Sequence, residues 1–312
     1  MNPSKTLLFS FLIPASMFAL VDEKSKNFEA EYPISFQDTG SNVIADGAKP
    51  KLVSNQFEFT EGPAVDKQGN IFFTDQPNDK IWKFDTEGKL SLFLDKTGRS
   101  NGMYFDKKGN LITAADENNE LWSISPDKKI TIIMKTYRGQ KLNGPNDLWI
   151  QKNGGIYFTD PYYHHSYWTR KKPDMTGEHL YYLPKGKEEA FIVDSNLVRP
   201  NGIVGSANGK NLFVADIGDK KTYKYDIKKN GSLGNRTLFT NIGSDGMKLD
   251  NKGNLYITGQ GVTIFNPEGK KIEHIPLPGW TANVCFGGKN RDILFITSGS
   301  SVYTLQMKVR GI

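Results

Sequence analysis

The stretch KLNGPNDLWIQKNGGIYFTDPY, from Lys141 to Tyr162, contains the unit from which most of the chain is built. Two short runs of apolar residues, 148–150 and 156–158, stand on either side of the polar segment 151–155. Apolar runs on both sides of an Asn-Gly turn are typical of a β-hairpin. The stretch therefore predicts two antiparallel strands, and the same pattern returns along the chain.

The chain contains six related hairpins. They are spaced by 40, 45, 55, 44 and 38 residues and begin at positions 61, 101, 146, 201, 245 and 283. A third β-rich run follows each hairpin, at 80–85, 120–125, 179–184, 221–226, 261–266 and 301–306. The first five units add a fourth, for example at 90–94, 130–134 and 190–193. Four strands in a unit of about 40 to 50 residues indicate a propeller blade. The sequence thus predicts an all-β fold, a six-bladed β-propeller of four-stranded antiparallel blades.

The two ends of this repeat region complement each other. The sixth unit ends after its third strand, whereas the segment Lys49–Ser54 precedes the first hairpin and has no hairpin of its own. We expect this N-terminal segment to pair with Ser301–Gln306 as the outermost strand of the last blade. Such a pairing would close the ring and cover strand edges that otherwise invite aggregation.

The first 21 residues have a different character. Lys5 precedes an apolar run over 6–21, which is short for a membrane span and resembles a secretory signal, although Met17 makes a poor cleavage site before Ala19. We therefore expect a signal peptide at 1–21, a lead-in at 22–44 and the propeller at 45–312. The expected location is periplasmic or secreted, with no membrane span after signal removal. The single cysteine, Cys285, excludes an intramolecular disulfide.

The charge of the chain says little about partners. The net charge of +6 is spread over Lys-rich turns such as 107–108 and 228–229. No basic stripe interleaved with aromatic residues is present in the sequence, so we favour solvated turns over a nucleic-acid surface. We expect a small-molecule substrate, no nucleic-acid partner, and a monomer or weak dimer.

The first residues of the six hairpins carry the chemistry. Equivalent positions in the inner strands of a propeller surround its channel, and here each has a side-chain oxygen: Glu61, Asn101, Asn146, Asn201, Asp245 and Asn283. Asn-Gly and Asp-Gly turns would explain Asn101 or Asn201 taken singly. Turn chemistry explains neither Glu61 nor the same register six times, so we favour a metal-binding ring.

The ligand types indicate which metal would bind. Carboxylate and amide oxygens without thiolate or imidazole suit a hard divalent cation, first Ca²⁺ and then Mg²⁺ or Mn²⁺. Zn²⁺ usually takes His or Cys ligands, and the four histidines show no zinc-type spacing, although Zn²⁺ stays possible. About four protein oxygens would leave positions open for water and substrate.

Several short motifs resemble the gluconolactonase/regucalcin family, and most closely its bacterial gluconolactonase branch. They are Glu61-Gly-Pro63, Leu142-Asn-Gly-Pro-Asn-Asp147, Phe158-Thr-Asp-Pro161, Arg199-Pro-Asn-Gly202, Ser244-Asp-Gly246 and Cys285-Phe-Gly-Gly288. The resemblance covers roughly residues 45–308 and implies a six-bladed propeller that binds a divalent metal and hydrolyses sugar lactones and related esters. It implies Glu61, Asn146, Asn201 and Asp245 as metal ligands, with Asp245 also the general base.

The resemblance further implies residues for the substrate. Asn101 matches a channel residue, and Arg99 stands where some sugar-lactone hydrolases place an arginine that contacts sugar hydroxyls. The third unit is the longest, and its extra residues after Asp160 are rich in aromatic and His side chains, including Tyr163 and His164. This segment is either a substrate lid or a long loop whose aromatic residues pack on the blade.

The predicted reaction is metal-assisted lactone hydrolysis with Asp245 activating a water molecule. A carboxylate bound to a dication is a weaker base, so Asp147, next to the ring, competes for this role. Two alternatives stay open. One is a phosphotriesterase-type hydrolase similar to diisopropyl fluorophosphatase, in which the metal-bound carboxylate is the nucleophile. The other is a non-catalytic binding propeller stabilised by its metal.

Overall fold

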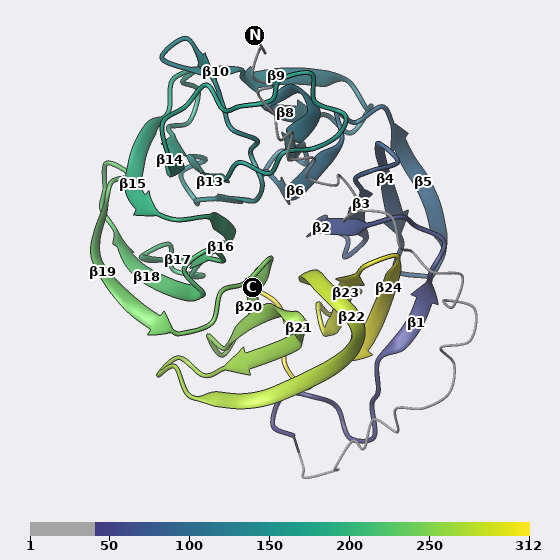
Figure 1. Ribbon diagram of the computed structural model, residues 1–312. Helices are drawn as coiled ribbons and strands as arrows, with labels where there is room; N and C mark the ends of the chain where they lie inside the picture. The colour runs from purple at the N-terminus through teal and green to yellow at the C-terminus, as the bar shows by residue number, and fades with distance from the viewer. Residues whose placement is uncertain (1–40) are drawn as a thin grey trace, which may run out of the picture. The chain divides into compact units, whose positions relative to one another are not determined.

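Four sheets of four antiparallel strands repeat along the chain, each running from a strand near the centre to one at the rim (Figure 1). The computed structural model describes residues 41–312, so the expected signal peptide and most of the expected lead-in lie outside the described residues. The first two sheets contain β2 (Thr60–Val65), β3 (Ile71–Asp75), β4 (Lys80–Phe84) and β5 (Leu90–Asp95), then β6 (Ser100–Phe105), β7 (Leu111–Ala115), β8 (Glu120–Ile124) and β9 (Ile130–Met134). The next two contain β12 (Leu148–Ile150), β13 (Ile156–Asp160), β14 (Glu178–Leu183) and β15 (Phe191–Leu197), then β16 (Pro200–Gly205), β17 (Asn211–Asp216), β18 (Lys221–Ile227) and β19 (Leu233–Thr240).

The last part of the chain differs from the expected pair of separate blades. It forms one six-stranded sheet in the order β1 (Lys51–Ser54), β24 (Ser301–Gln306), β23 (Ile293–Ser298), β22 (Lys271–Gly287), β21 (Leu255–Phe265) and β20 (Met247–Leu249). The expectation of six separate four-stranded sheets is therefore correct for four of them.

The reason for the difference lies in two long strands. The first half of β21 pairs with β20 and its second half with β22, so β21 covers both the second and the third strand expected for the fifth unit. Gly259 stands between these halves and Gly261 lies near the start of the second, with positive φ angles of 152° and 73°. In the same way, β22 pairs with β21 through its first half and with β23 through its second half.

The expected partner of the N-terminal segment is correct. β1 pairs antiparallel with β24, with Lys51 opposite Thr304 and Leu52 opposite Tyr303. An isolated bridge between Ile44 and Met307 extends the contact of the N-terminal side with the C-terminal end. Residues far apart in the sequence thus share the outer edge of the last sheet.

The inner strands contact each other in a closed cycle. β2 contacts β6, and the contacts continue through β12, β16, β20 and β22 back to β2. The second half of β22 supplies the sixth inner strand. Polar positions at equivalent points of these strands consequently face one common centre.

Apolar side chains fill the space between neighbouring sheets. Phe73 of β3 is fully buried and lies 5.3 Å from the ring of Phe295 in β23, measured between ring centroids. Phe158 of β13 stacks on Tyr181 of β14 at 5.0 Å, in a cluster that also includes Leu121 of β8. Burying one such aromatic side chain contributes about 1.5 to 3 kcal/mol. This packing holds each inner strand in place.

Two small elements were outside the repeat pattern, and one long connection was expected from it. The hairpin of β10 (Thr136–Tyr137) and β11 (Gln140–Lys141) and the 3₁₀ helix η2 (Asp116–Asn118) lie between regular strands. The segment 161–177 joins β13 to β14, as the longest repeat spacing predicts. Nowhere in residues 41–312 is a helix long and apolar enough to span a bilayer.

Candidate functional site

The site is built from the six positions at which the repeats begin, which we call the channel ring: Glu61, Asn101, Asn146, Asn201, Asp245 and Asn283. Four of them lie within β2, β6, β16 and β22, and the other two each come two residues before a strand, β12 or β20. Because the inner strands meet in a closed cycle, this common register brings the six residues to one level of the channel.

Hydrogen bonds join neighbouring ring members. The Asn283 amide Nδ2 donates to Glu61 Oε2 at 3.1 Å, which links the last inner strand to the first. The Asn201 amide Nδ2 donates to Asp245 Oδ1 at 2.9 Å. The backbone N–H of Gly102, next to Asn101, donates to the Asn146 carbonyl at 2.7 Å. The ring is therefore a physical cluster and not only a sequence register.

Three amide oxygens of the ring have no hydrogen-bond donor. The Oδ1 atoms of Asn101, Asn146 and Asn201 are buried and unpaired among the described residues. A buried polar atom without a partner costs free energy, and most such atoms in folded proteins are satisfied. Three orphaned acceptors in one ring therefore indicate that a positively charged or hydrogen-bonding ligand completes the site.

Two ring carboxylates share the same centre. Burial, and next the nearby charge of Asp245, raise the pKa of Glu61 well above its usual value. Burial also raises the pKa of Asp245 to about 6, against the opposing hydrogen bonds from Trp280 and Asn201. Like charges in a poorly solvated site favour protons, and they equally favour a bound cation.

The donor set fits a hard divalent cation. It consists of the two carboxylates and the orphaned amide oxygens, the ligands that Ca²⁺ prefers. Within residues 41–312 no group of three or more His, Cys, Asp and Glu side chains is arranged to hold a metal. Cys285 lies near the channel, but burial raises the pKa of its thiol to about 12 and keeps it neutral. Asparagine oxygens would therefore have to complete the coordination that the two carboxylates begin.

Trp280 is a member of the site that sequence reasoning missed. Its indole Nε1 donates to Asp245 Oδ2 at 2.6 Å, although the residue is 45% exposed. The hydrogen bonds from Trp280 and Asn201 occupy both oxygens of Asp245 and fix the plane of its carboxylate. A tryptophan three residues before the last ring position was the one available signal.

Asp147 is held differently. It is 2% exposed, its Oδ1 accepts the backbone N–H of Leu148 at 2.8 Å, and its Oδ2 accepts that of Ile203 at 3.4 Å. Burial raises its pKa, and the positive charge of Lys248 opposes the rise. Both carboxylate oxygens thus bind backbone donors, which makes Asp147 a link between inner strands.

The long connection 161–177 reaches the ring through one residue. The Tyr163 hydroxyl accepts a hydrogen bond from Asn201 Nδ2 at 3.1 Å. His164 is exposed, and its ring lies 6.5 Å from that of Tyr162. Of the two lid residues expected from sequence, the structure therefore brings Tyr163 to the ring, while a substrate contact by His164 stays a prediction.

The same connection is anchored on the second sheet. The Trp168 indole donates to the Asp116 backbone carbonyl at 3.2 Å, and the Tyr167 hydroxyl donates to the Asp116 carboxylate. Arg99 lies over the Tyr167 ring at 4.5 Å and donates to the Pro77 carbonyl. Arg99 thus supports the connection, and its proposed contact with a sugar stays a prediction.

Comparisons with known proteins identify relatives of this chain and structures of similar fold. The family model described as SMP-30/Gluconolactonase/LRE-like region matches residues 59–300. The gluconolactonase of Zymomonas mobilis is 28% identical over 304 residues, which cover 86% of this chain and 85% of that protein. The solved structure of a gluconolactonase from Xanthomonas campestris has a TM-score of 0.79 at 26% identity and covers 85% of this chain and 90% of its own. The diisopropyl-fluorophosphatase of Loligo vulgaris is 27% identical over 153 residues, which cover 44% of this chain and 48% of that protein.

Proposed function

Because the chain belongs to the SMP-30/gluconolactonase/LRE-like family, we propose that it is a metal-dependent hydrolase that opens a sugar lactone. The observation that carries the proposal is the set of buried, unpaired Oδ1 atoms of Asn101, Asn146 and Asn201 beside two carboxylates. These amide oxygens have no hydrogen-bond donor among residues 41–312, and a bound cation would give them a partner. A cation held in this way would leave a coordination position for a substrate oxygen.

Glu61, Asn146, Asn201 and Asp245 would hold the cation, with Ca²⁺ as the best match to their oxygens. When bound, a divalent cation polarises an ester carbonyl and stabilises the negative charge that develops on its oxygen. The other members of the channel then have separate tasks. Asn101 has an amide oxygen free to accept a hydroxyl of the substrate.

Asp245 is the proposed general base. One of its oxygens takes a proton from water as the water oxygen bonds to the carbonyl carbon. The ring C–O bond then breaks, and the proton passes to the departing oxygen, which becomes the hydroxyl of the product acid. Asp245 is only partly buried and its oxygens are held by side chains, whereas those of Asp147 are held by the backbone. This contrast supports Asp245 over Asp147 as the proton acceptor.

A hydrolysis panel tests the proposal. The protein, stripped with EDTA, is assayed on an aldonolactone, a homoserine lactone and an aryl ester, after reloading with Ca²⁺, Mg²⁺, Mn²⁺ or Zn²⁺ and against an enzyme-free blank. We expect aldonolactone hydrolysis that disappears with EDTA and returns with cation. Binding of Ca²⁺ by calorimetry together with no turnover of any substrate would favour the non-catalytic binding propeller instead.

A second candidate reaction has one observation in its favour, the likeness of 44% of the chain to diisopropyl-fluorophosphatase. In that reaction the Asp245 carboxylate would attack the substrate, so one of its own oxygens would leave with the product. Turnover in ¹⁸O-labelled water should then place the label in Asp245. If Asp245 carries no label after many turnovers, the carboxylate is not the nucleophile, and water activation is the remaining mechanism.

We also propose that the scaffold of this site is a six-bladed propeller closed by the N-terminal segment. The six inner strands in a closed cycle and the pairing of β1 with β24 support this reading. On that reading, deleting residues 1–55 lowers the melting temperature strongly, whereas deleting residues 1–30 does not. Equal melting temperatures of the two truncated proteins would contradict it.

A further inference from the structure

A second pocket lies at the other end of the channel. It is formed by residues two to four positions after the ring members on the same inner strands, including Ala64, Tyr104, Trp149, Val204 and Lys248. Three residues of a strand span about 10 Å, so this far pocket is separated from the channel ring by about that distance. Its volume is about 270 Å³, far more than the roughly 10–15 Å³ that a cavity needs to hold one water molecule.

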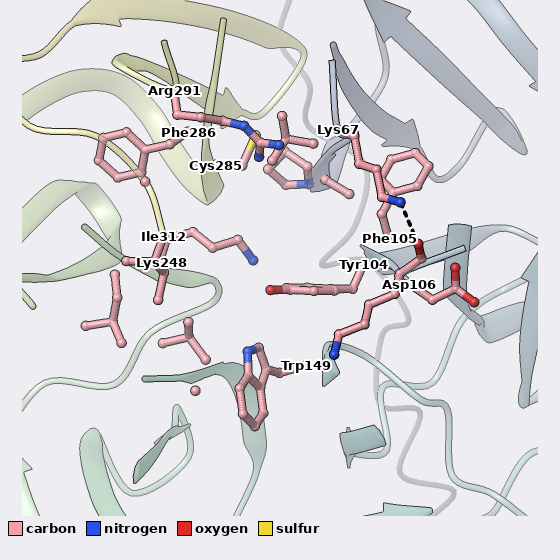
Figure 2. Close-up of a pocket in the computed structure, with 18 residues that line it drawn as sticks. Lys67, Tyr104, Phe105, Asp106, Trp149, Lys248, Cys285, Phe286, Arg291 and Ile312 are labelled. Carbon is pink, nitrogen blue, oxygen red and sulfur yellow. Dashed lines mark hydrogen bonds between the residues drawn. The ribbon is translucent and has the colours of Figure 1, made fainter. Parts of the chain in front are cut away.

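The walls of the far pocket are mostly apolar and aromatic. Trp149 is 5% exposed, and Phe286 is 4% exposed. In Figure 2 the phenol of Tyr104 extends across the pocket between Trp149 and the side of Arg291. Flat aromatic walls of this kind favour a ligand with an apolar body.

Positive charge gathers in the far pocket, where the Asp147 carboxylate lies near enough to Lys248 for their charges to interact but forms no ion pair with it. Lys67, Lys107, Lys248 and Arg291 line it, and Lys248 and Arg291 are partly buried. Arg291 donates to the Asp66 backbone carbonyl at 2.6 Å, but among residues 41–312 no carboxylate forms an ion pair with Arg291 or Lys248. Figure 2 shows the ammonium of Lys248 directed into the pocket toward the Tyr104 hydroxyl.

The one acidic residue of the lining, Asp106, is already engaged. Its Oδ1 accepts the backbone N–H groups of Lys108 and Asn110, each at 2.8 Å, and its Oδ2 accepts the Asn110 side chain at 2.9 Å. These bonds form the turn between β6 and β7, and Asp106 makes no ion pair with Lys248. An unpaired, partly buried ammonium is costly unless an anion joins it.

We propose that the far pocket is a second binding site, which takes a small carboxylic acid with an aromatic or aliphatic body. The carboxylate lies against Lys248 and Arg291, where charge-assisted hydrogen bonds are strongest, and the body packs between Tyr104 and Trp149. The apolar walls disfavour a bare inorganic anion, because it would lose its hydration without gaining contacts. This site is separate from the proposed catalytic ring and does not depend on its chemistry.

Calorimetry with the full-length protein tests this site, using benzoate as the probe. We expect benzoate to bind with a dissociation constant of about 1 mM or lower, with and without EDTA, because a metal in the channel ring is not involved. Benzyl alcohol, a neutral molecule of similar size, and inorganic phosphate should each bind at least tenfold more weakly. Equal binding of benzoate and benzyl alcohol, or tighter binding of phosphate, would overturn the proposal.

A variant pair locates the site. Lys248→Met keeps the length of the side chain and removes the charge, so benzoate should bind about 10- to 100-fold more weakly. Lys252→Met, at an exposed lysine four residues further along, is the matched control and should bind as the wild type does. Benzoate binding that Lys248→Met leaves unchanged would refute the assignment. Should Lys248→Met fail to fold, as judged by circular dichroism, the three probes on the wild type still decide the question.

Discussion

The orientation of Asn201 offers a sharp test of the channel ring. Its amide Nδ2 donates to both the Tyr163 hydroxyl, at 3.1 Å, and Asp245 Oδ1, at 2.9 Å. With both bonds on the nitrogen side, the amide oxygen is left unpaired. The substitution Tyr163→Phe removes one of the two bonds without altering any proposed ligand. We therefore expect it to weaken cation binding by loosening the amide.

The size of the effect follows from the energy of the lost bond. A hydrogen bond between neutral groups contributes about 0.5 to 1.5 kcal/mol net. If that energy serves only to orient Asn201, the dissociation constant for Ca²⁺ should rise about 2- to 13-fold, since RT is about 0.6 kcal/mol at 25 °C. The bond to Asp245 remains in the variant, so binding should be weakened and not abolished.

The assay is a calorimetric titration of the EDTA-stripped protein with Ca²⁺, which needs no assumption about substrate. Tyr162→Phe is the matched control, because the Tyr162 hydroxyl is buried without a hydrogen-bond partner in the described part of the chain. This control should bind Ca²⁺ as the wild type does. An unchanged dissociation constant in Tyr163→Phe, or an equal loss in both variants, would refute the reasoning.

Three further outcomes follow from the structure. At saturating Ca²⁺, Asp245→Asn should lower kcat about 10²- to 10⁴-fold, and loss of turnover in Asp147→Asn alone would instead assign the base to Asp147. Gly62 has a φ of 50°, and an added Cβ would lie 1.9 Å from the Asn101 carbonyl oxygen, so Gly62→Ala should cost about 3 kcal/mol or more in urea unfolding. Gly88→Ala, with a φ of 83° but no neighbour within 4 Å, should cost only about 1 to 2 kcal/mol. Burial raises the pKa of Asp160 to about 7, so the folded protein keeps a proton that the unfolded chain releases near pH 4. The free energy of unfolding of the wild type, compared with that of Asp160→Asn, should therefore fall as the pH rises from about 4 to about 7. The fall should be at most about 1.4 kcal/mol per pH unit.

Strand positions could be predicted from the sequence because each hairpin is local. The runs 80–85, 120–125 and 301–306 match β4, β8 and β24 to within one residue. The segment between the two halves of β21 is only two residues long, too short to reverse the chain, so the strands expected as separate form one continuous strand. The pairing of β1 with β24 was predictable only because one unit lacked a strand.

The details of the site were less accessible, since they depend on contacts between blades. Repeat register identified the six ring members, but not the bond from Trp280 to Asp245, because Trp280 lies in the middle of the neighbouring long strand β22. The anchoring of the connection 161–177 on Asp116 joins two sheets through residues 51 and 52 positions apart. A substrate contact by Arg99 stays a prediction, and its aromatic partner Tyr167 could not be foreseen from local sequence.

The glycines after the ring residues explain why the register and the site go together. In the sequence, Asn-Gly and Asp-Gly are as typical of turns as of a ring. Gly102 and Gly202 lie inside β6 and β16, and neither they nor Gly246 have a positive φ, which excludes the turn. A Cβ on Gly102 would lie 2.5 Å from Asp147 Oδ1, one on Gly202 would lie 2.8 Å from the Asp245 carbonyl, and one on Gly246 would lie 2.0 Å from Asn283 Cγ. Each glycine therefore lets the next inner strand approach closely, and this close approach is what brings side-chain oxygens from different blades to a common centre.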